Sequence, residues 1–329
     1  ETTVDSRGKP LSTCYRLMSH TNHVIDNVNN DLLNGKSLQY YIDLIGDYVS
    51  PYPDPVVTVH EGVRVVRDDL SVGTKIRGGD LLASRAKEKR VVYVQPRTGL
   101  AGVSLLDVCK RRDKDLTLFM PSSKRISHHQ ACCIERGADA RFIRIAAMPV
   151  LNSYAKRWAE EHGHFFVPLG LKHELVTAGL IAAALTIPEP EEVWTVVSTG
   201  VLTRALQIAW PNAKFHAVAV ARNMKSGEIG RADIISAPEP FTKSVRSEDQ
   251  PPFPSVLTYD AKAWRYIPKN TGRDILFWNV GQNPTLFNES IYDTTNSYRE
   301  WGDFRDFERP VCDNEKNIES HSRVGANVG

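Results

Sequence analysis

At about 150 residues per domain, the 329 residues predict two domains or one large α/β unit. Hydrophobic residues make up 41% and charged residues 24% of the chain, which argues against a mostly disordered polypeptide. The 41 Lys and Arg residues nearly balance the 39 Asp and Glu residues, which argues against a chain-wide nucleic-acid-binding surface. The longest apolar run, 179–187, is far shorter than the roughly 20 residues of a membrane span, so we expect no membrane association and no signal peptide.

Short apolar runs rich in β-branched residues alternate with helical patterns along most of the chain. The expected strands are 63–67, 91–95, 116–120, 142–146, 194–198, 215–221 and 274–278. The expected helices are 37–48, which prolines 51, 53 and 55 end, and 126–136, 151–161, 173–185 and 202–209. Strands that alternate with helices predict a mostly parallel sheet covered on both faces.

The strands fall into two groups, separated by a stretch of Pro and charged residues at 187–192. We therefore predict an α/β fold of two subdomains with mostly parallel twisted sheets flanked by helices. The small subdomain spans 90–189, and the large one combines 1–89 with 190–329. Residues 1–50 and 288–329 are expected to be peripheral extensions, and the aromatic residues of the second are expected to cover an apolar patch or the partner of a homodimer.

Five cysteines are scattered along the chain, and neither they nor the ten histidines have the spacing of metal ligands. The adjacent His128 and His129 would point about 100° apart on a helix and cannot easily share a metal. We expect no metal site, and free thiols in a reducing cytoplasm.

Residues 67–77 (Arg-Asp-Asp-Leu-Ser-Val-Gly-Thr-Lys-Ile-Arg) form the densest group of chemically active side chains. A strand ends in three charges, a turn contains Gly73, and Lys75 begins a helix. Burial between apolar strands and the positive end of the helix dipole both lower the pKa of a lysine, as a Schiff-base amine requires. The alternative from these residues alone is a solvated lysine in a surface turn.

This segment resembles the cofactor-lysine motif of fold-type II pyridoxal-phosphate (PLP) enzymes, and is most similar to the aminocyclopropane-carboxylate deaminase and D-cysteine desulfhydrase branch. That motif reads roughly Lys-Arg-Glu-Asp, a glycine turn, and Gly-Asn-Lys-x-Arg-Lys-Leu-Glu, with Asp80 at the position of the last Glu. The resemblance implies that Lys75 forms the Schiff base with PLP, in a cleft between the two subdomains.

A second stretch that is similar to the family follows the strand 91–95. Thr98, Gly99 and Gly102 fit the turn that holds the substrate carboxylate and the PLP ring in the family. The resemblance therefore implies that Thr98 and Gly99 contact the substrate. Leu100 stands where the family usually has an Asn that bonds the phenolic oxygen of PLP, and Leu offers no such hydrogen bond.

A third stretch, 197–203, is similar to the glycine-rich turn that holds the PLP phosphate, although Val201 stands where a glycine is usual. Backbone N–H groups at a helix N-terminus suit a phosphate dianion. The residues implied to hold the phosphate are Ser198, Thr199, Gly200 and Thr203.

The fourth stretch contains Tyr259 and Asp260, which match a Tyr-Glu pair of the deaminase branch. The resemblance implies that Tyr259 lies near the substrate and that Asp260 lies against the pyridine nitrogen, where a carboxylate keeps the ring protonated. The alternative is a surface aspartate in the first turn of a helix.

The resemblance covers about residues 55–287 and implies a PLP enzyme acting at Cα or Cβ of an amino acid, by elimination, deamination, β-replacement or decarboxylation. Lys75 would hold PLP and then move the α or β proton. Two other hypotheses stay open: an aminoacyl group carried on a nucleotide or DNA base as the substrate, and a pseudoenzyme or binding module that kept the fold.

Two basic clusters bear on the nucleic-acid alternative. They are expected at helix C-termini, where cations are favoured, but they could also meet phosphates. Their members are Lys87, Lys89, Arg90, Lys110, Arg111, Arg112 and Lys114.

Overall fold

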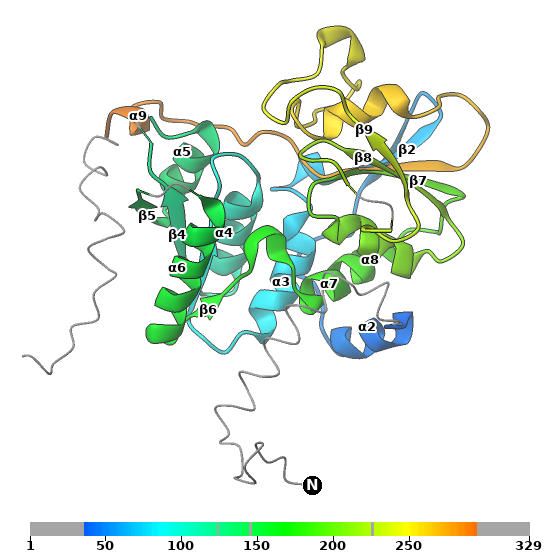
Figure 1. Ribbon diagram of the computed structural model, residues 1–329. Coiled ribbons are helices and arrows are strands. Elements are labelled where there is room, and N and C mark those ends of the chain that lie inside the picture. The colour runs from blue at the N-terminus through cyan, green and yellow to red at the C-terminus, as the bar shows by residue number, and fades with distance from the viewer. Residues whose placement is uncertain (1–35, 124, 145–146, 225–226, 295–329) are drawn as a thin grey trace, which may run out of the picture.

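The computed structural model describes residues 36–123, 125–144, 147–224 and 227–294 (Figure 1). They form a six-stranded sheet in the order β1-β2-β10-β7-β8-β9 and a four-stranded sheet in the order β5-β4-β3-β6. Every neighbouring pair is parallel except β1 and β2. The predicted α/β fold with mostly parallel sheets flanked by helices is confirmed.

The described strands are β1 (Val57–His60), β2 (Val63–Arg67), β3 (Arg90–Val94), β4 (Asp115–Pro121), β5 (Asp139–Ile143), β6 (Phe165–Phe166), β7 (Glu192–Val197), β8 (Lys214–Ala219), β9 (Asp233–Ser236) and β10 (Ile275–Asn279). The described α-helices are α2 (Leu38–Ile45), α3 (Lys75–Arg85), α4 (Ala101–Arg111), α5 (His128–Glu135), α6 (Met148–Glu161), α7 (Glu174–Ala184), α8 (Val201–Ala209) and α9 (Ile291–Thr294). Short 3-10 helices include η1 (Asp68–Leu70), η2 (Leu169–Leu171) and η4 (Asp260–Tyr266).

The differences from the expected strands lie at the edges of the two sheets. All seven expected strands are present, but β5 begins three residues earlier than expected, and β1, β6 and β9 were missed. These four strands are the edge strands of the two sheets. Edge strands are short and partly exposed, so their apolar pattern is weak. In β5, the polar Asp139 and Arg141 form an ion pair with each other at this edge, 3.3 Å apart.

The first helix is also shorter than expected. Ser37 begins it, with its hydroxyl accepting a hydrogen bond from the Tyr40 N–H, and Gly46 ends it. Gly46 adopts φ +54°, a left-handed conformation that glycine accepts without steric cost. The expectation that the prolines at 51–55 end the helix was therefore wrong, because the chain leaves the helix five residues earlier.

Helices α3 and α7 pack with their backbones in close contact near the centre of the molecule (Figure 1). A Cβ on Gly78 would lie 2.4 Å from the carbonyl oxygen of Val176, and a Cβ on Gly179 would lie 2.7 Å from that of Arg77. Only glycine allows this approach at either position. It holds the helix that begins at Lys75 against its neighbour.

The division into subdomains remains a proposal, with one adjustment. Strands β3 to β6 fall within the predicted small subdomain, which supports it. Helix α7 also falls within 90–189, but it packs against α2, α3 and α8. This packing favours a chain crossing before α7 rather than at residue 189.

After β10 the chain crosses from the six-stranded sheet to the helices beside the four-stranded one, as the segment that runs to α9 in Figure 1 shows. On the way, the imidazole of His128 lies 2.6 Å from the Pro284 carbonyl oxygen, and Arg136 donates to the Thr285 carbonyl. The Glu135 carboxylate accepts from the N–H groups of Phe287 and Asn288. The predicted tail aromatics at 298, 301, 304 and 307 lie outside the described residues.

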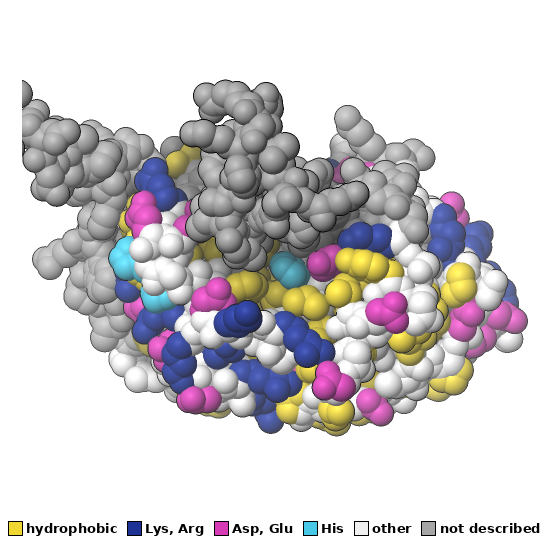
Figure 2. All heavy atoms as spheres, turned by 90° about the horizontal axis from the view of Figure 1, so that it is seen from below, with side chains coloured by type: hydrophobic (Ala, Val, Ile, Leu, Met, Phe, Trp, Pro, Cys, Tyr) yellow, Lys and Arg dark blue, Asp and Glu magenta, His cyan; other side chains and the backbone are white. Residues whose placement is uncertain are grey.

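The two predicted basic clusters are mostly tied to neighbouring groups. Figure 2 shows one face of the molecule, on which Lys and Arg side chains lie among Asp and Glu side chains. Four members form ion pairs, which are Lys89–Asp113, Arg90–Asp115, Arg111–Asp107 and Arg112–Asp80. Lys110 and Lys114 donate to backbone carbonyls. These contacts favour a structural role for the clusters.

Candidate active site

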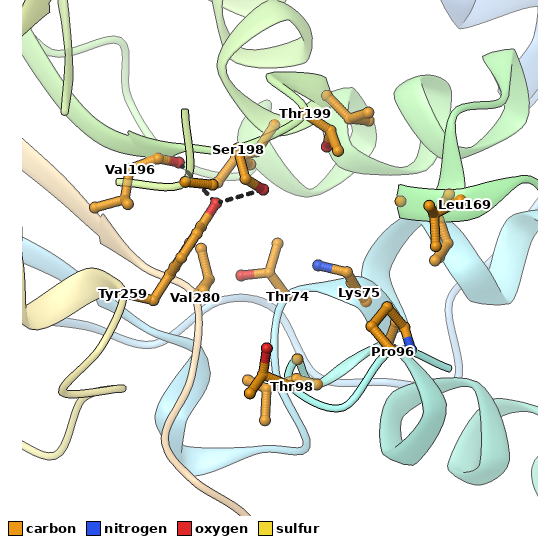
Figure 3. A pocket seen from close by; sticks show the side chains of 18 of the residues that line it. Thr74, Lys75, Pro96, Thr98, Leu169, Val196, Ser198, Thr199, Tyr259 and Val280 are labelled. Carbon is orange, nitrogen blue, oxygen red and sulfur yellow. Dashed lines mark hydrogen bonds between the residues drawn. The ribbon is translucent and has the colours of Figure 1, made fainter. Parts of the chain in front are cut away.

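A cavity of about 340 Å³ lies where the carboxyl ends of β3 and β7 meet the N-terminus of α3 (Figure 3). This volume is within the usual range of small-molecule sites. In open α/β folds, ligands bind at the carboxyl ends of the strands. The cavity is lined by eight of the nine predicted site residues, all but Asp260: Lys75, Thr98, Gly99, Ser198, Thr199, Gly200, Thr203 and Tyr259.

Lys75 is the first residue of α3, and its side chain points into this cavity (Figure 3). The preceding residue, Thr74, is fixed from three sides. Its N–H donates to the Val280 carbonyl at 2.8 Å, and its hydroxyl donates to Asp68 at 2.6 Å and accepts from the Trp278 indole at 3.0 Å. These bonds determine where the helix begins and therefore where the lysine enters the cavity.

The charged residues before Lys75 form a buried network outside the cavity. Asp68 accepts from Arg77, Thr74 and Trp278, and Asp69 accepts from Arg67 and Asn279. Asp80 likewise lies outside the cavity, where it accepts from Arg112 and Tyr48. The charged segment before Lys75, by which the sequence identifies this lysine, therefore stabilises the start of α3 and does not line the cavity.

Burial lowers the pKa of Lys75, while the nearby Asp260 opposes this shift. None of the described residues accepts a hydrogen bond from the Lys75 ammonium. A lysine whose amine is neutral more often than in water is a better nucleophile and base. Of the two effects expected from the sequence to lower this pKa, burial is the one that acts on Lys75.

Asp260, the first residue of η4, is fully buried and does not line the cavity itself. Neither of its carboxylate oxygens has a hydrogen-bond partner among the described residues. Burial raises the pKa of Asp260 well above its ordinary value, although the Val280 amide and Lys75 pull it down. A buried carboxyl to which no described side chain donates is costly, and a polar ligand group beside it would stabilise it.

Tyr259 stands between β7 and the cavity. Its hydroxyl donates to the Val196 carbonyl at 3.3 Å and to the Ser198 hydroxyl at 3.4 Å (Figure 3). Burial raises the pKa of this phenol, so it stays protonated at neutral pH. Tyr259 therefore holds the first residue of the predicted phosphate turn.

The predicted phosphate turn, Ser198–Gly200, leads from β7 into α8. Gly200 adopts the left-handed conformation, with φ +74°, at the N-cap of the helix. The first N–H groups of α8 have no partners within the helix and can donate hydrogen bonds to an anion. The hydroxyl of Thr203 differs from expectation, because it is buried in a 2.8 Å hydrogen bond with Thr195.

The predicted substrate turn at Thr98 and Gly99 is shaped by a residue that the sequence did not reveal. Gln95 donates from its amide nitrogen to the Pro96 and Gly99 carbonyls and accepts from the Gly102 N–H at 2.7 Å. A Cβ on Gly102 would lie 2.6 Å from the Gln95 side-chain oxygen. The family-like glycine at 102 is therefore explained by the close approach of Gln95.

Leu100, at the position of the family's asparagine, fills the space between two glycines. Its Cδ1 would lie 3.1 Å from a Cβ on Gly73 and 2.5 Å from one on Gly281. It lines the cavity as an apolar surface.

His129 also lines the cavity, and the sequence did not identify it. It lies in the first turn of α5, which Ser127 caps. Burial lowers its pKa to about 4, so the imidazole is neutral at physiological pH. The only signal in the sequence is the pair of adjacent histidines, which by itself indicates no role in this cavity. No group of His, Cys, Asp and Glu in the described part of the chain is arranged to hold a metal ion.

This sequence matches no family model and no curated protein, whereas its structure matches several solved structures. An ACC deaminase homologue has a TM-score of 0.59 at 16% identity, covering 80% of this chain and 99% of its own. Threonine deaminase isoform 2 from Solanum lycopersicum has a TM-score of 0.59 at 14% identity, covering 80% and 93%. A pyridoxal 5'-phosphate-dependent aspartate racemase has a TM-score of 0.55 at 12% identity, covering 75% and 95%.

At these identities the likeness concerns the fold, and it extends over almost the whole length of each of these proteins. Among the described helices, none is long and apolar enough to cross a membrane. The same chain has this fold, a lysine at the start of α3, and a cavity into which that lysine points. The chain thus has the fold of the fold-type II PLP-dependent enzymes, as its resemblance in sequence predicted.

Proposed function

We propose that this protein is a PLP-dependent enzyme that acts at Cα or Cβ of an amino acid through a covalent linkage of the cofactor to Lys75. The observation that carries the proposal is the lysine itself. It is the one ammonium among the described residues that line the cavity, and burial holds its pKa below the ordinary value. The fold, shared with amino-acid deaminases and a racemase, supports the same substrate class.

The residues around Lys75 fit the cofactor at its two polar ends. The N–H groups of the turn Ser198–Gly200 and of α8 suit the phosphate. The Asp260 carboxyl, which lacks a partner, suits the pyridine nitrogen. Thr98 and Gly99 would hold the substrate carboxylate. Leu100 offers no hydrogen bond to the phenolic oxygen, so this chain does without that contact.

Bound PLP supplies an electron sink that stabilises negative charge at the carbon next to the amino group. The amine of Lys75, when free, would be placed to accept the proton from Cα or Cβ, and its lowered pKa makes the basic form more available than in water. Tyr259 orients Ser198 and faces the same cavity. Leu100 and Val201 add apolar surface to the cavity, which would limit the access of water to the reacting carbon.

The test is a titration of the purified protein with PLP, followed by a panel of free L- and D-amino acids and of amino acids linked to nucleotides. We expect a visible absorption band from the lysine-bound cofactor, and a change of that band with free amino acids. Response only to the nucleotide-linked compounds would favour the nucleotide substrate. No band with Lys75 intact would overturn the proposal in favour of a binding module.

A homodimer and a cytoplasmic location remain predictions, the second supported by the free thiols of Cys109, Cys132 and Cys133.

Replacing Asp260 by Asn is expected to stabilise the cofactor-free protein while weakening its chemistry. The native pKa of Asp260 is raised, so the native state holds a proton that the unfolded state releases above about pH 4. Stability is therefore lost as pH rises from about 4 toward the native pKa, and the amide removes that loss. Asp260→Asn should melt at a higher temperature than wild type at pH 8 and at nearly the same temperature at pH 4.

The measurement is thermal unfolding of both cofactor-free proteins across this pH range, with turnover of the loaded forms. Turnover should fall by about tenfold or more, since a neutral amide cannot keep the pyridine nitrogen charged. Melting temperatures that differ equally at pH 4 and pH 8 would contradict a buried, protonated carboxyl.

A further inference from the structure

Cationic side chains gather around the N-terminus of α8, where the family has glycines. Arg204 lies in the first turn of α8, Lys172 follows η2, and Arg222 follows β8. The Coulomb interactions that act on Lys172 come from Arg204, Arg222 and Glu228, so these groups share one neighbourhood. Glu228 is the carboxylate among them, and it is ion-paired with Arg222. The neighbourhood therefore carries an excess of positive charge.

Arg204 is held against the turn that precedes its helix. It is 5% exposed, and its Nη2 donates to the Thr199 carbonyl oxygen at 3.2 Å. Its Nη1 would lie 2.9 Å from a Cβ on Gly200, so no larger residue fits there without a shift. The carbonyl and the N–H of a trans peptide point in opposite directions. With the Thr199 carbonyl turned toward Arg204, the Gly200 N–H of the same peptide is turned away from the guanidinium.

The segment that carries Lys172 passes close to the same turn from a different part of the chain. Gly170, two residues earlier, is so close to Thr199 that a Cβ on it would lie 2.8 Å from the Thr199 Cγ2. The ammonium of Lys172 has no hydrogen-bond or ion-pair partner among the described residues. Burial, followed by Arg204 and Arg222, lowers its pKa, and only Glu228 opposes this. An anion at the turn would relieve this repulsion.

We propose that Arg204 and Lys172 support, from behind the cavity lining, a phosphate site at Thr199 and Gly200, with a phosphate monoester dianion, that of PLP, as its ligand. Arg204 acts as a positioning residue, since it orients the Thr199–Gly200 peptide, and both side chains add charge. Val201, the first residue of α8, keeps its backbone N–H, and the two cations add positive charge at this end of the site. The inference rests on the proposed function, but it concerns the phosphate end alone.

The test compares PLP with pyridoxal, which has the same ring and aldehyde but no phosphate. Binding to the cofactor-free protein is followed by absorbance and by protein fluorescence for wild type, Lys172→Gln, Arg204→Gln and Arg204→Lys. Lys214→Gln is the matched control, since it removes an exposed lysine at the start of β8, at the opposite end of that strand from the cavity. Inorganic phosphate is titrated as a separate probe by thermal shift.

We expect Lys172→Gln and Arg204→Gln each to weaken PLP binding by about tenfold or more, with little change for pyridoxal. The salt dependence of PLP binding should become shallower. Arg204→Lys should recover part of the affinity, because it keeps the charge but not the forked geometry. Lys214→Gln should bind PLP like wild type, and inorganic phosphate should compete with PLP.

Equal losses for PLP and pyridoxal would overturn the inference, since they would show a general structural effect. Unchanged PLP binding in Lys172→Gln and in a folded Arg204 variant would overturn it too. Phosphate that binds equally well to the PLP-loaded protein would overturn the assignment to the cofactor in favour of a substrate phosphate. If wild type binds inorganic phosphate but not PLP, the proposed function fails while the anion site stands, so the two failures are distinguishable.

Discussion

Replacing Lys75 by Ala is expected to abolish covalent attachment of PLP and to lower turnover by at least about a thousandfold. Lys75 would serve both as the attachment point and as the base, and removal of a residue with two such roles is among the largest single effects in catalysis. The fold should survive, because the Lys75 ammonium has no hydrogen-bond partner among the described residues that its removal would strand. The measurement is the visible spectrum with PLP, before and after borohydride reduction, with mass spectrometry of the trapped peptide.

The matched control for Lys75→Ala is Lys262→Ala, because Lys262 is also buried and also has a lowered pKa. It differs in that its ammonium donates to the Pro240 carbonyl at 2.9 Å and does not line the cavity. We expect Lys262→Ala to keep the absorption band, though with lower stability. Trapping of PLP on Lys262 or any other lysine in the wild type would contradict the assignment of Lys75.

Replacing Asp68 by Ala is expected to cost about 3–5 kcal/mol of unfolding free energy, the range observed when one partner of a buried ion pair is removed. Asp68 is fully buried and pairs with Arg77 at 2.7 Å. The substitution leaves Arg77 buried without its carboxylate and takes away one partner each from Thr74 and Trp278. Denaturant unfolding of the cofactor-free protein measures the loss.

Two comparisons make the Asp68 result specific. Asp47→Ala also removes the carboxylate of an ion pair, with Arg85, but at an exposed site, so stability should not change measurably. Asp68→Asn should lose less stability than Asp68→Ala, since the amide oxygen can still accept hydrogen bonds. A denaturation midpoint for Asp68→Ala equal to that of wild type would show that the network does not support the start of α3.

The sequence predicted most of the fold because the central strands are buried on both faces and therefore read as continuous apolar runs. Strands β3, β4, β7 and β10 were all found to within two residues. The edge strands were shifted or missed, since a strand with one open side carries polar residues and gives a weaker pattern. The end of α2 was misplaced because Gly46, rather than a proline, ends it.

The candidate site was predictable where a motif lies within a few consecutive residues. Lys75 follows a charged strand end and a glycine turn, and Ser198–Gly200 lie between a strand and a helix, so both could be aligned with a family pattern. His129, Gln95 and the pair Arg204 and Lys172 could not be found this way. Each becomes informative only through a partner far along the chain or through the cavity that it lines.

The sequence by itself determined the alternation of strands and helices, the position of Lys75 at the start of a helix, and the likeness to a PLP-binding fold. These depend on local periodicity, glycine and proline placement, and short motifs. Only the tertiary structure decided which charges are buried. Asp68 and Asp260 look alike in sequence, yet Asp68 accepts a hydrogen bond from Trp278, 210 residues away, and no side chain in the described part of the chain donates to Asp260. The difference arises because the free energy of a buried charged group depends on the groups that pack around it. That packing is determined by contacts between distant parts of the chain.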